Sequence, residues 1–385
     1  MGYDFTLDDV AYLRGAEGAA ALAETAGSEL SARPRLAAIG RARARFGDRA
    51  ALLIETVLLR RKAEAKVDDA ASWLFTDDAL QQATPSPVAR HRGARLAGRR
   101  VHDVTCSIGA ELSALVPVAD MVIGSDLDPV RLAMAAHNVP GAVLVRADAL
   151  RPCTRDTVVI ADPARRSGGR RTYDPAALMP PLPDLLDVYA GRDLAVKCAP
   201  GLDFDRLDWD GEMEIVSLDA GVREACLWSP GLSGPGVRRR ASVLRSDGTA
   251  WTITDAEPDE IPEREPGEWI VDPDGAVVRA GLVRHYAARH GLWQLDPRIA
   301  YLTGDSVPDG VRGFRILARL KYTEKALRQE LAARDCGSAE ILVRGLDVDP
   351  AVLRPRLKLR GSTPLSVVLT RIGRTPVAFV CAART

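Results

Sequence analysis

Four aspartates in the middle of this 385-residue sequence each lie at the end of a short apolar run. The runs are VHDV, MVIGSD, AVLVRAD and TVVIAD, and the aspartates are Asp103, Asp126, Asp148 and Asp162. An ionised carboxylate only accepts hydrogen bonds, so these side chains suit a ligand that carries amino groups and hydroxyls. Parallel sheets bind their ligands at the carboxyl ends of the strands. We therefore expect the four carboxylates to lie close together at one edge of a sheet.

The loop after the first run, in VHDVTCSIGAEL, contains a single glycine, Gly109. A dinucleotide fingerprint needs G-x-G-x-x-G so that the backbone can approach a pyrophosphate, and the sequence therefore disfavours NAD and FAD. One glycine together with Asp103 suits a ligand without phosphates, which donates an amino group to Asp103 and places a small amino-acid moiety in the loop. Cys106, also in this loop, is expected to pack against the ligand.

The next two runs end in residues that suit a nucleoside. Asp126 is placed to accept from two ribose hydroxyls, and each hydrogen bond to a charged acceptor contributes about 1.5–3 kcal/mol. Leu127 is expected to pack on one face of an adenine, and Asp148 and Ala149 are expected to meet the adenine edge. The alternative is that Asp126 and Asp148 only cap the helices that follow the strands.

The pattern of apolar and polar residues predicts the helices and strands that position these residues. From Arg100 onward, short apolar runs alternate with helical segments, and LAVKC and MEIVSL add two further runs. Strand–helix alternation of this kind predicts an α/β fold, with a parallel sheet that carries helices on both faces. Residues 1–97 read as helices, among them one that starts at Ser86 before Pro87, where a proline loses no needed N–H.

The 52 basic and 52 acidic side chains balance overall, but they are distributed unevenly. Residues 247–275 hold ten acids against one base, Arg264, together with four prolines, which predicts a solvated connection or an edge excursion. Residues 311–385 hold 15 Arg or Lys against 6 Asp or Glu. Within them, GFRILARLKY alternates apolar and basic residues, which predicts a half-buried strand with a basic outer face.

Cysteine and histidine usage argues against a disulfide framework or a metal site. The six cysteines form no C-x-x-C pair, and the five histidines form no ligand-spaced pair. No run approaches the roughly 18–20 apolar residues that a membrane span needs. The first residues lack the basic-then-apolar profile of a signal peptide. We expect a cytoplasmic protein that binds neither a membrane nor a metal.

The order of the four acidic motifs resembles the class I S-adenosylmethionine-dependent methyltransferases, over about residues 70–230. The resemblance implies a Rossmann-like sheet and S-adenosylmethionine as the cofactor. It also implies cofactor-binding roles for residues on the loops after the first three strands: Asp103, Cys106, Gly109, Asp126, Leu127, Asp148 and Ala149.

A second resemblance lies just before the first strand. Trp73-Leu-Phe-Thr76, followed by Thr84-Pro-Ser-Pro-Val-Ala-Arg-His91, is similar to the W-(F/Y)-S-V-T-P-E-x-I-A-x-H stretch of trimethylguanosine-synthase-like RNA cap enzymes. In that family a helical extension and a tryptophan help to hold guanine, which implies substrate contacts for Trp73 and Thr76. A core or interdomain position for Trp73 is the alternative.

The C-terminal block, with RGFRILARLKYTEKAL and LTRIGRTPVAFV, resembles the THUMP-like domain of a group of predicted bacterial methyltransferases. THUMP domains bind RNA, so the resemblance implies a tRNA or rRNA partner, with Arg315, Arg319 and Lys321 on its phosphates. A solvated basic face is the alternative. The expected domains are a helical domain (1–97), a methyltransferase domain (98–235), an acidic connecting segment (236–290) and a THUMP-like domain (291–385).

The fourth run continues as Asp162-Pro163-Ala164-Arg165, where amino-directed methyltransferases carry (D/N/S)-P-P-(Y/F/W). The resemblance implies that Asp162 and Pro163 hold the acceptor amino group, and that Arg165 or Arg166 stacks on the base or binds phosphate. The missing aromatic disfavours adenine N6 as the acceptor. The guanine amino group and a guanine ring nitrogen remain as possible methyl acceptors.

Three other functions stay open, and one of them is a methyltransferase of small molecules or proteins whose basic domain serves only for assembly. DPARRSG faintly resembles the D-P-P-R-A-G of uracil-C5 methyltransferases, in which a cysteine adds to the pyrimidine ring. Cys198 is the candidate nucleophile, with Lys197 beside it to lower the thiol pKa; a buried structural cysteine is the alternative. A methyltransferase fold without activity would serve only to bind RNA. The favoured hypothesis is methyl transfer to a base nitrogen, preferably of guanine, in structured RNA.

Overall fold

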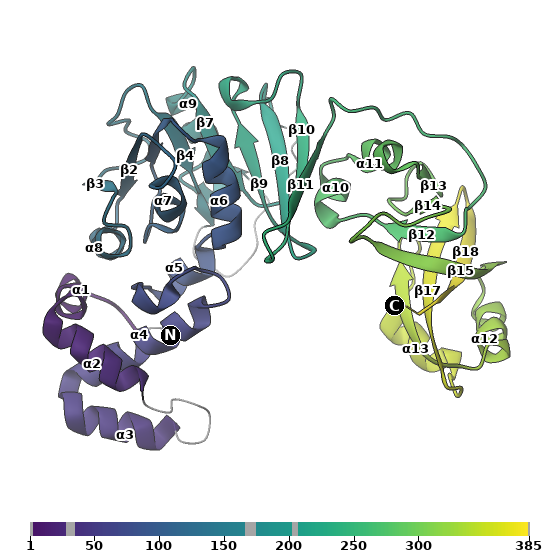
Figure 1. Ribbon diagram of the computed structural model, residues 1–385, viewed down its shortest axis with the longest axis horizontal. Coiled ribbons are helices and arrows are strands. Elements are labelled where there is room, and N and C mark those ends of the chain that lie inside the picture. The colour runs from purple at the N-terminus through teal and green to yellow at the C-terminus, as the bar shows by residue number, and fades with distance from the viewer. Residues whose placement is uncertain (1–2, 28–34, 166–174, 202–206, 384–385) are drawn as a thin grey trace. The chain divides into compact units, whose positions relative to one another are not determined.

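The computed structural model describes residues 3–27, 35–165, 175–201 and 207–383 (Figure 1). The chain divides into two compact units. The first unit comprises residues 1–218, 223–235 and 244–249, and the second comprises residues 219–222, 236–243 and 250–385. Within the described ranges, no helix is both long enough and apolar enough to cross a membrane.

The N-terminal part of the first unit is helical, as predicted. Its helices are α1 (Leu7–Arg14), α2 (Ala16–Ala26), α3 (Arg35–Phe46), α4 (Ala50–Ala63), α5 (Asp77–Gln82) and α6 (Ser86–Arg95). Thr6 begins α1 with a capping box, because its hydroxyl accepts from the Asp9 N–H while the Asp9 carboxylate accepts from the Thr6 N–H. Helix α4 buries Leu52, Leu53 and Val57 in the core that these helices share with the sheet. Burying one such side chain contributes about 1.5–3 kcal/mol.

The strands of the first unit's sheet lie in the order β8-β9-β7-β4-β1-β2-β3. They are β1 (Arg100–Asp103), β2 (Met121–Asp126), β3 (Val143–Arg146), β4 (Val158–Ala161), β7 (Leu194–Cys198), β8 (Glu212–Leu218) and β9 (Gly221–Trp228). The pairs β1–β2, β2–β3, β1–β4 and β4–β7 are parallel, which confirms the predicted α/β sheet. The connections contain α7 (Ala110–Leu115), α8 (Pro129–Asn138) and α9 (Leu182–Val188).

The direction of strand succession reverses at β1. Strands β2 and β3 extend the sheet on one side of β1, and β4 and β7 extend it on the other. In open α/β sheets, the crevice for ligands lies at such a reversal, beyond the carboxyl ends of the strands. The topology therefore places the predicted aspartates where a ligand site is expected.

A further strand, β9, lies between β7 and β8. It pairs antiparallel with β7, and a tight turn at Asp219 and Ala220, both with positive φ, joins it to β8. The run VREACLW leaves open whether Glu224 is a site carboxylate or a strand acid, and the structure places Glu224 in β9, where it is buried. Farther along the chain from β4, a short ribbon pairs β5 (Ala164–Arg165) with β6 (Leu178–Met179).

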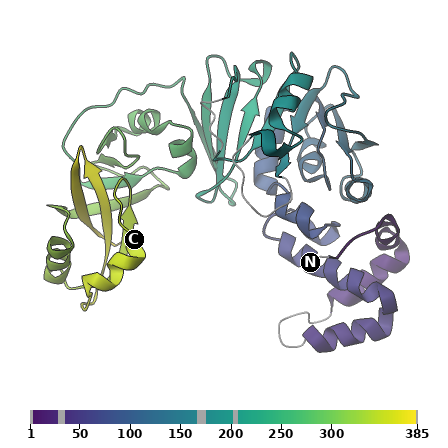
Figure 2. The ribbon, with the colours of Figure 1, turned by 180° about the vertical axis from the view of Figure 1, so that it is seen from behind.

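The second unit contains a mixed sheet in the order β13-β14-β12-β15-β18-β17-β16, which Figure 2 shows from behind. Its strands are β12 (Trp269–Asp272), β13 (Trp293–Gln294), β14 (Leu302–Gly304), β15 (Arg312–Lys321), β16 (Cys336–Val343), β17 (Thr363–Ile372) and β18 (Thr375–Ala382). Its other elements are β10 (Arg239–Leu244), β11 (Ala250–Thr254), α10 (Gly275–Arg279), α11 (Val283–His290), α12 (Glu324–Ala333) and α13 (Pro350–Leu357).

The C-terminal elements agree with the sequence pattern. Strand β15 alternates between exposed and less exposed residues as GFRILARLKY predicts, with Phe314 fully buried. The last two strands, β17 and β18, form a hairpin that turns at Gly373, whose φ is +61°. Because glycine has no Cβ, it adopts this left-handed conformation without steric cost.

The acidic connection expected over residues 236–290 is instead built largely from regular elements. Strand β12 lies between β14 and β15, and its Ile270 and Val271 are fully buried. Glu265 and Glu268 precede this short strand and Asp272 is its last residue, and Glu265 forms an ion pair with Arg319 of β15. A strand this short, within a run of acids and prolines, contains too few alternating apolar and polar residues for its two-residue period to be recognised in the sequence.

Candidate functional site

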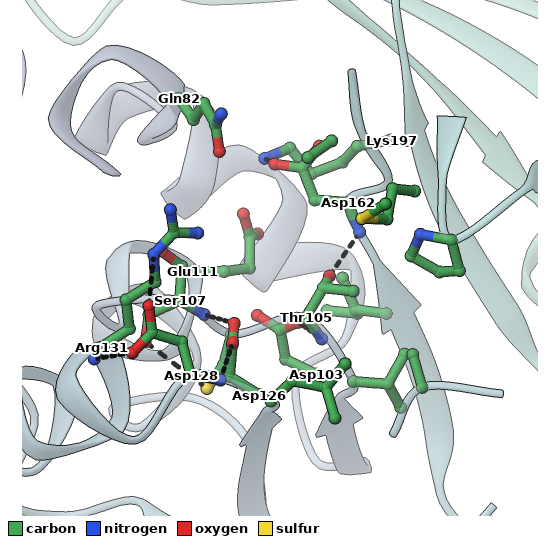
Figure 3. Close-up of a pocket in the computed structure, with 18 of the residues that line it drawn as sticks. Gln82, Asp103, Thr105, Ser107, Glu111, Asp126, Asp128, Arg131, Asp162 and Lys197 are labelled. Carbon is green, nitrogen blue, oxygen red and sulfur yellow. Dashed lines mark hydrogen bonds and ion pairs between the residues drawn. The ribbon is translucent and has the colours of Figure 1, made fainter. Parts of the chain in front are cut away.

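A cavity of about 500 Å³ lies at the carboxyl ends of β1, β2 and β4 in the first unit (Figure 3). All four predicted aspartates line it: Asp103, Asp126, Asp148 and Asp162. Ligand cavities for small molecules usually measure about 300–1,000 Å³, so the space suits a ligand of nucleoside size.

Asp103 is the most buried of these carboxyls, with 3% of its surface exposed. It ends β1, and its Oδ1 accepts from the N–H of Thr105 at 3.0 Å. Burial and, to a smaller extent, the nearby carboxylates of Glu111 and Asp162 raise the pKa of Asp103 to about 7, against the lowering effect of the Thr105 N–H and of Lys197. Asp103 is therefore poised to ionise near neutral pH, when a cationic amino group can replace its proton.

Gly109 gives the loop after β1 its shape. It precedes α7 with φ +92°, and a Cβ at this position would lie 2.8 Å from Cγ2 of Val139. Any other residue would meet both the strain of a positive φ and this contact. Cys106 in the same loop is buried and lines the cavity, and burial raises the pKa of its thiol. Among the residues of this loop, Cys106, Ser107 and Ile108 line the cavity, whereas Gly109 shapes the loop without lining it.

Asp126 is fixed by the backbone of two neighbouring loops. Its Oδ2 accepts from the N–H of Ser107 at 3.0 Å, and its Oδ1 accepts from the N–H of Asp128 at 2.9 Å. Each carboxylate oxygen can accept more than one hydrogen bond, so both oxygens keep capacity for hydroxyl donors. Leu127, which is 60% exposed, adds an apolar surface to the same wall.

The wall after β3 is formed by Asp148 and Ala149. Oδ1 of Asp148 accepts from the N–H of Leu150 at 2.9 Å. The carbonyl oxygen of Ala149 accepts from the hydroxyl of Tyr189 at 2.7 Å, which anchors this turn to α9 and the residues after it. The turn is thus held at two points while its polar edge faces the cavity.

Asp162 lies on a different side of the cavity from Asp126 and Asp128 (Figure 3). Its backbone N–H donates to Oγ1 of Thr105 at 2.7 Å, and its carboxylate lies 2.5 Å from Nζ of Lys197. Lys197 comes from β7, and only 9% of its side chain is exposed, against 40% for Asp162. This partly buried ion pair gives the cavity a hydrogen-bond acceptor and a donor side by side.

Lys197 was predicted only as a neighbour of Cys198, and the structure gives it a more direct place in the cavity wall. The position of Lys197 beside Asp162 follows from the register of two parallel strands. Because Ala161 of β4 pairs with Val196 of β7, the next residues of both strands lie side by side. Such a register becomes visible only after the strand order is known.

The other site residues predicted after β4 are Pro163, Arg165 and Arg166. Pro163 is buried, and it is not among the described residues that line the cavity. Arg165 lies in β5 opposite Leu178, and Arg166 lies outside the described residues. Met179 of β6 was not predicted; it is 59% exposed and lines the cavity.

Trp73 and Thr76 do not line the cavity, contrary to the substrate contacts expected for them. Trp73 is 5% exposed and stacks on Phe75 within the core, with ring centroids 5.9 Å apart. Oγ1 of Thr76 accepts from the N–H of Ala79 and so caps α5. Both residues support the helix that contributes Gln82 to the wall. The alternative of a core tryptophan is therefore the correct one.

Cys198 is buried, and its Sγ lies 3.8 Å from the carbonyl oxygen of Val196. Burial raises the pKa of its thiol well above the usual value. Since the thiolate is the nucleophilic form, this environment disfavours attack by Cys198. Among the described residues, no group of three His, Cys, Asp or Glu side chains is arranged to hold a metal ion.

The basic residues predicted to contact phosphate belong to the second unit. Arg315, Arg319 and Lys321 are exposed and alternate along β15, so they share one face of the strand. Nη1 of Arg319 lies 2.7 Å from the Glu265 carboxylate. The face is therefore basic, and an acid of the same unit already contacts part of it.

Comparisons with known proteins agree with both parts of this description. Residues 311–383 match a family model described as THUMP domain-like. Two strains of Mycobacterium tuberculosis, CDC 1551 and H37Rv, each have a relative named as an uncharacterized S-adenosylmethionine-dependent methyltransferase. Each is 60% identical over 353 residues, which cover 88% of this chain and 98% of the relative.

A crystal structure of a candidate methyltransferase from Porphyromonas gingivalis W83 is similar over the whole of both chains. Its TM-score is 0.74 at 18% sequence identity. At this identity the likeness concerns the fold, and it extends through both the helical N-terminal part and the C-terminal sheet.

Proposed function

This chain belongs to the S-adenosylmethionine-dependent methyltransferases, and from that premise we propose that it methylates a base nitrogen, preferably of guanine, in a structured RNA such as tRNA or rRNA. The observation that carries the proposal is the Asp162–Lys197 pair in the wall of the cavity. The pair offers a carboxylate and an ammonium group to an acceptor that enters the same cavity as the cofactor.

The residues of the cavity fit the cofactor. In the proposed site, Asp103 accepts from the amino group of the methionine moiety, and Asp126 accepts from the two ribose hydroxyls. Leu127 packs on the adenine, and the turn at Asp148 and Ala149 meets its edge. The cavity is rich in carboxylates, which suits a ligand with a positively charged sulfur. Bound S-adenosylmethionine supplies an activated methyl group.

Guanine matches the Asp162–Lys197 pair better than the other bases do. Its Watson–Crick edge has two adjacent donors, N1–H and the N2 amino group, beside one acceptor, O6. The Asp162 carboxylate accepts from the donors, while Lys197 donates to O6. Met179, exposed in the wall, offers an apolar contact for the base in place of the aromatic that the Asp162-Pro163-Ala164-Arg165 segment lacks.

The residues then act mainly by alignment. As the N–CH3 bond forms and the S–CH3 bond breaks, the attacking nitrogen loses a proton, and the Asp162 carboxylate takes it. Holding two reactants in line converts a bimolecular step into a unimolecular one, worth about 7–11 kcal/mol when the geometry is ideal. No nucleophile of the protein is needed, which agrees with the burial of Cys198.

The proposal of an RNA substrate rests on the second unit. Arg315, Arg319 and Lys321 form a basic face on β15, within the residues that match the THUMP domain-like family. Basic side chains that neutralise phosphates release counterions, so they give RNA affinity that weakens as salt rises.

The test is methyl transfer by the purified full chain. Unfractionated RNA from a strain that lacks the gene is incubated with radiolabelled S-adenosylmethionine, and the nucleosides are then identified by mass spectrometry. We expect a methylated guanosine, and we expect Asp162→Asn to lower the rate by about 100-fold or more, because a positioned proton acceptor contributes about that much. Asp187→Asn, a change at an exposed residue of α9, is the matched control.

Three results would contradict the proposal. A C5-methylated pyrimidine as the product would favour the cysteine-dependent chemistry. RNA binding without any methyl transfer would favour a protein that only binds RNA. An Asp162→Asn variant as active as the wild type would remove Asp162 from the reaction.

A further inference from the structure

The ammonium group of Lys197 has a second partner besides Asp162. Its Nζ lies 2.5 Å from Oγ1 of Thr84, a buried residue between α5 and α6 that also lines the cavity. An ammonium group carries three hydrogens, so these two contacts leave one for a ligand. Three segments far apart in the sequence thus meet at one nitrogen atom.

The hydroxyl of Thr84 is oriented by a second contact, with the carboxylate of Glu111. Its Oγ1 lies 3.4 Å from Oε2 of Glu111, and both carboxylate oxygens of Glu111 lie 2.7 Å from Nη1 of Arg92. Nη2 of Arg92 contacts the Glu224 carboxylate. Thr84, Glu111, Arg92 and Glu224 are all buried. Because Glu111 only accepts, the Thr84 hydroxyl donates to it and presents a lone pair to Lys197.

The contacts with Asp162 and Thr84 together fix the orientation of the Lys197 ammonium group. Lysine has a flexible four-carbon stem, and an ammonium held by Asp162 alone can rotate about that single contact. Two contacts on different sides of the nitrogen, from Asp162 and from Thr84, fix its remaining N–H direction. Glu111 also lines the cavity, and the buried Arg92 holds both of its carboxylate oxygens, so close packing restricts its movement.

We infer that Thr84 is a positioning residue for acceptor recognition, which holds Lys197 so that its third N–H donates to a carbonyl oxygen of the base beside the atoms bound by Asp162. This inference rests on the proposed function, and it assigns the choice between bases to Lys197 and its support. A base that lacks a carbonyl oxygen beside its N–H donor leaves the Lys197 hydrogen without a partner, and a buried donor without a partner is unfavourable.

The test compares Thr84→Val with Thr84→Ser in the full chain. Valine keeps the shape of threonine but removes the oxygen, whereas serine keeps the hydroxyl. With RNA from the deletion strain, we expect Thr84→Val to lower the methyl-transfer rate at saturating S-adenosylmethionine by about ten-fold or more, because misplaced groups near a reacting atom have effects of this size or larger. Thr84→Ser restores the rate, and the calorimetric affinity for S-adenosylmethionine stays unchanged in both variants.

A second readout does not depend on activity. The chain has only six lysines, at positions 62, 66, 197, 321, 325 and 358, so isotope-labelled lysine gives a simple ammonium spectrum. The Lys197 signal is assigned by its loss in Lys197→Arg. We expect Thr84→Val to shift or broaden this signal and Thr84→Ser to preserve it, because hydrogen-bonded ammonium hydrogens exchange slowly with water.

The outcomes separate the two proposals. A wild type that methylates no RNA rejects the proposed function. A wild type that does so, with a Thr84→Val variant of equal rate, rejects only the role of Thr84. An unchanged Lys197 signal in Thr84→Val also rejects that role, whatever the activity.

Discussion

The Asp126 carboxylate occupies its place because two backbone N–H groups, from Ser107 and Asp128, bind its two oxygens. In the proposed site it also binds both ribose hydroxyls of the cofactor. Replacing it with alanine removes charged hydrogen bonds worth about 1.5–3 kcal/mol each, so the affinity for S-adenosylmethionine should fall by about ten-fold or more. Calorimetric titration measures this change.

The control for Asp126→Ala is Asp187→Ala, at an exposed position of α9. Its affinity should equal that of the wild type. If Asp126→Ala binds the cofactor as tightly as this control, the ribose lies elsewhere in the cavity.

The buried Asp103 makes cofactor binding depend on pH. Its pKa, raised to about 7 chiefly by burial, lies above that of the unfolded chain, near 4. The protonated form therefore stabilises the ligand-free protein at low pH, and this contribution is lost as the pH rises through 7. A cationic amino group instead needs the ionised form, so cofactor affinity should rise between about pH 5.5 and 7.5.

Titrations at a series of pH values test this prediction, with Asp103→Asn as the comparison. The variant cannot ionise at this position, so its weaker affinity should vary less with pH over the same range. Equal pH profiles for the two proteins would show that Asp103 does not hold the amino group.

Some residues of the cavity could be predicted from the sequence, and others could not. Asp103, Asp126, Asp148 and Asp162 were predictable because each ends an apolar run, and local pattern alone locates a strand end. Lys197 was not recognised as a wall residue, because its contact with Asp162 depends on which strands pair and in which register.

The loop between β1 and α7 depends on Gly109 for two reasons, its φ of +92° and its closeness to Val139. Gly98 provides a matched control, because its φ is +69° but a Cβ there would meet nothing within 4 Å. A non-glycine residue in this conformation costs about 1–3 kcal/mol. We expect Gly98→Ala to show only this cost, and Gly109→Ala to lose more stability and also cofactor affinity.

Thermal unfolding and calorimetry of the two variants measure these effects. Equal stability losses would mean that the loop adapts to the Cβ without hindrance from Val139. Unchanged cofactor affinity in Gly109→Ala would mean that the loop does not shape the site.

Helix α6 shows a contact that its composition does not predict. Its sequence SPVARHRGAR is rich in arginine, yet Arg92 is almost fully buried against Glu111 and Glu224. Arginine is rarely buried unless it is paired, and the partners come from α7 and β9, distant in the sequence. Glu224 is a buried residue of the strand β9, which is one of the two interpretations that the run VREACLW leaves open.

Over the whole chain, the zero net charge conceals a basic face on β15 in the second unit. If this face binds RNA, replacing Arg315, Arg319 and Lys321 by alanine together should weaken binding. The log–log dependence of affinity on salt should become shallower by up to about 0.9 per lost phosphate contact. Cofactor affinity, which belongs to the first unit, should not change.

Binding assays over a range of salt concentrations measure the slope. Arg14, Arg41 and Arg43, exposed on the N-terminal helices, provide a triple-alanine control with the same change in net charge. An equal effect of the two triple variants would show that only the net charge matters, and that β15 has no particular role.

The central claim is that the chain methylates guanine in RNA with the help of Asp162. The most direct measurement is the mass-spectrometric profile of modified nucleosides in total RNA from strains that carry the wild-type gene, the Asp162→Asn gene or no copy. We expect one methylated guanosine that is present with the wild-type gene and absent from the other two strains. Identical profiles in all three strains, or the loss of a methylated pyrimidine instead, would contradict it.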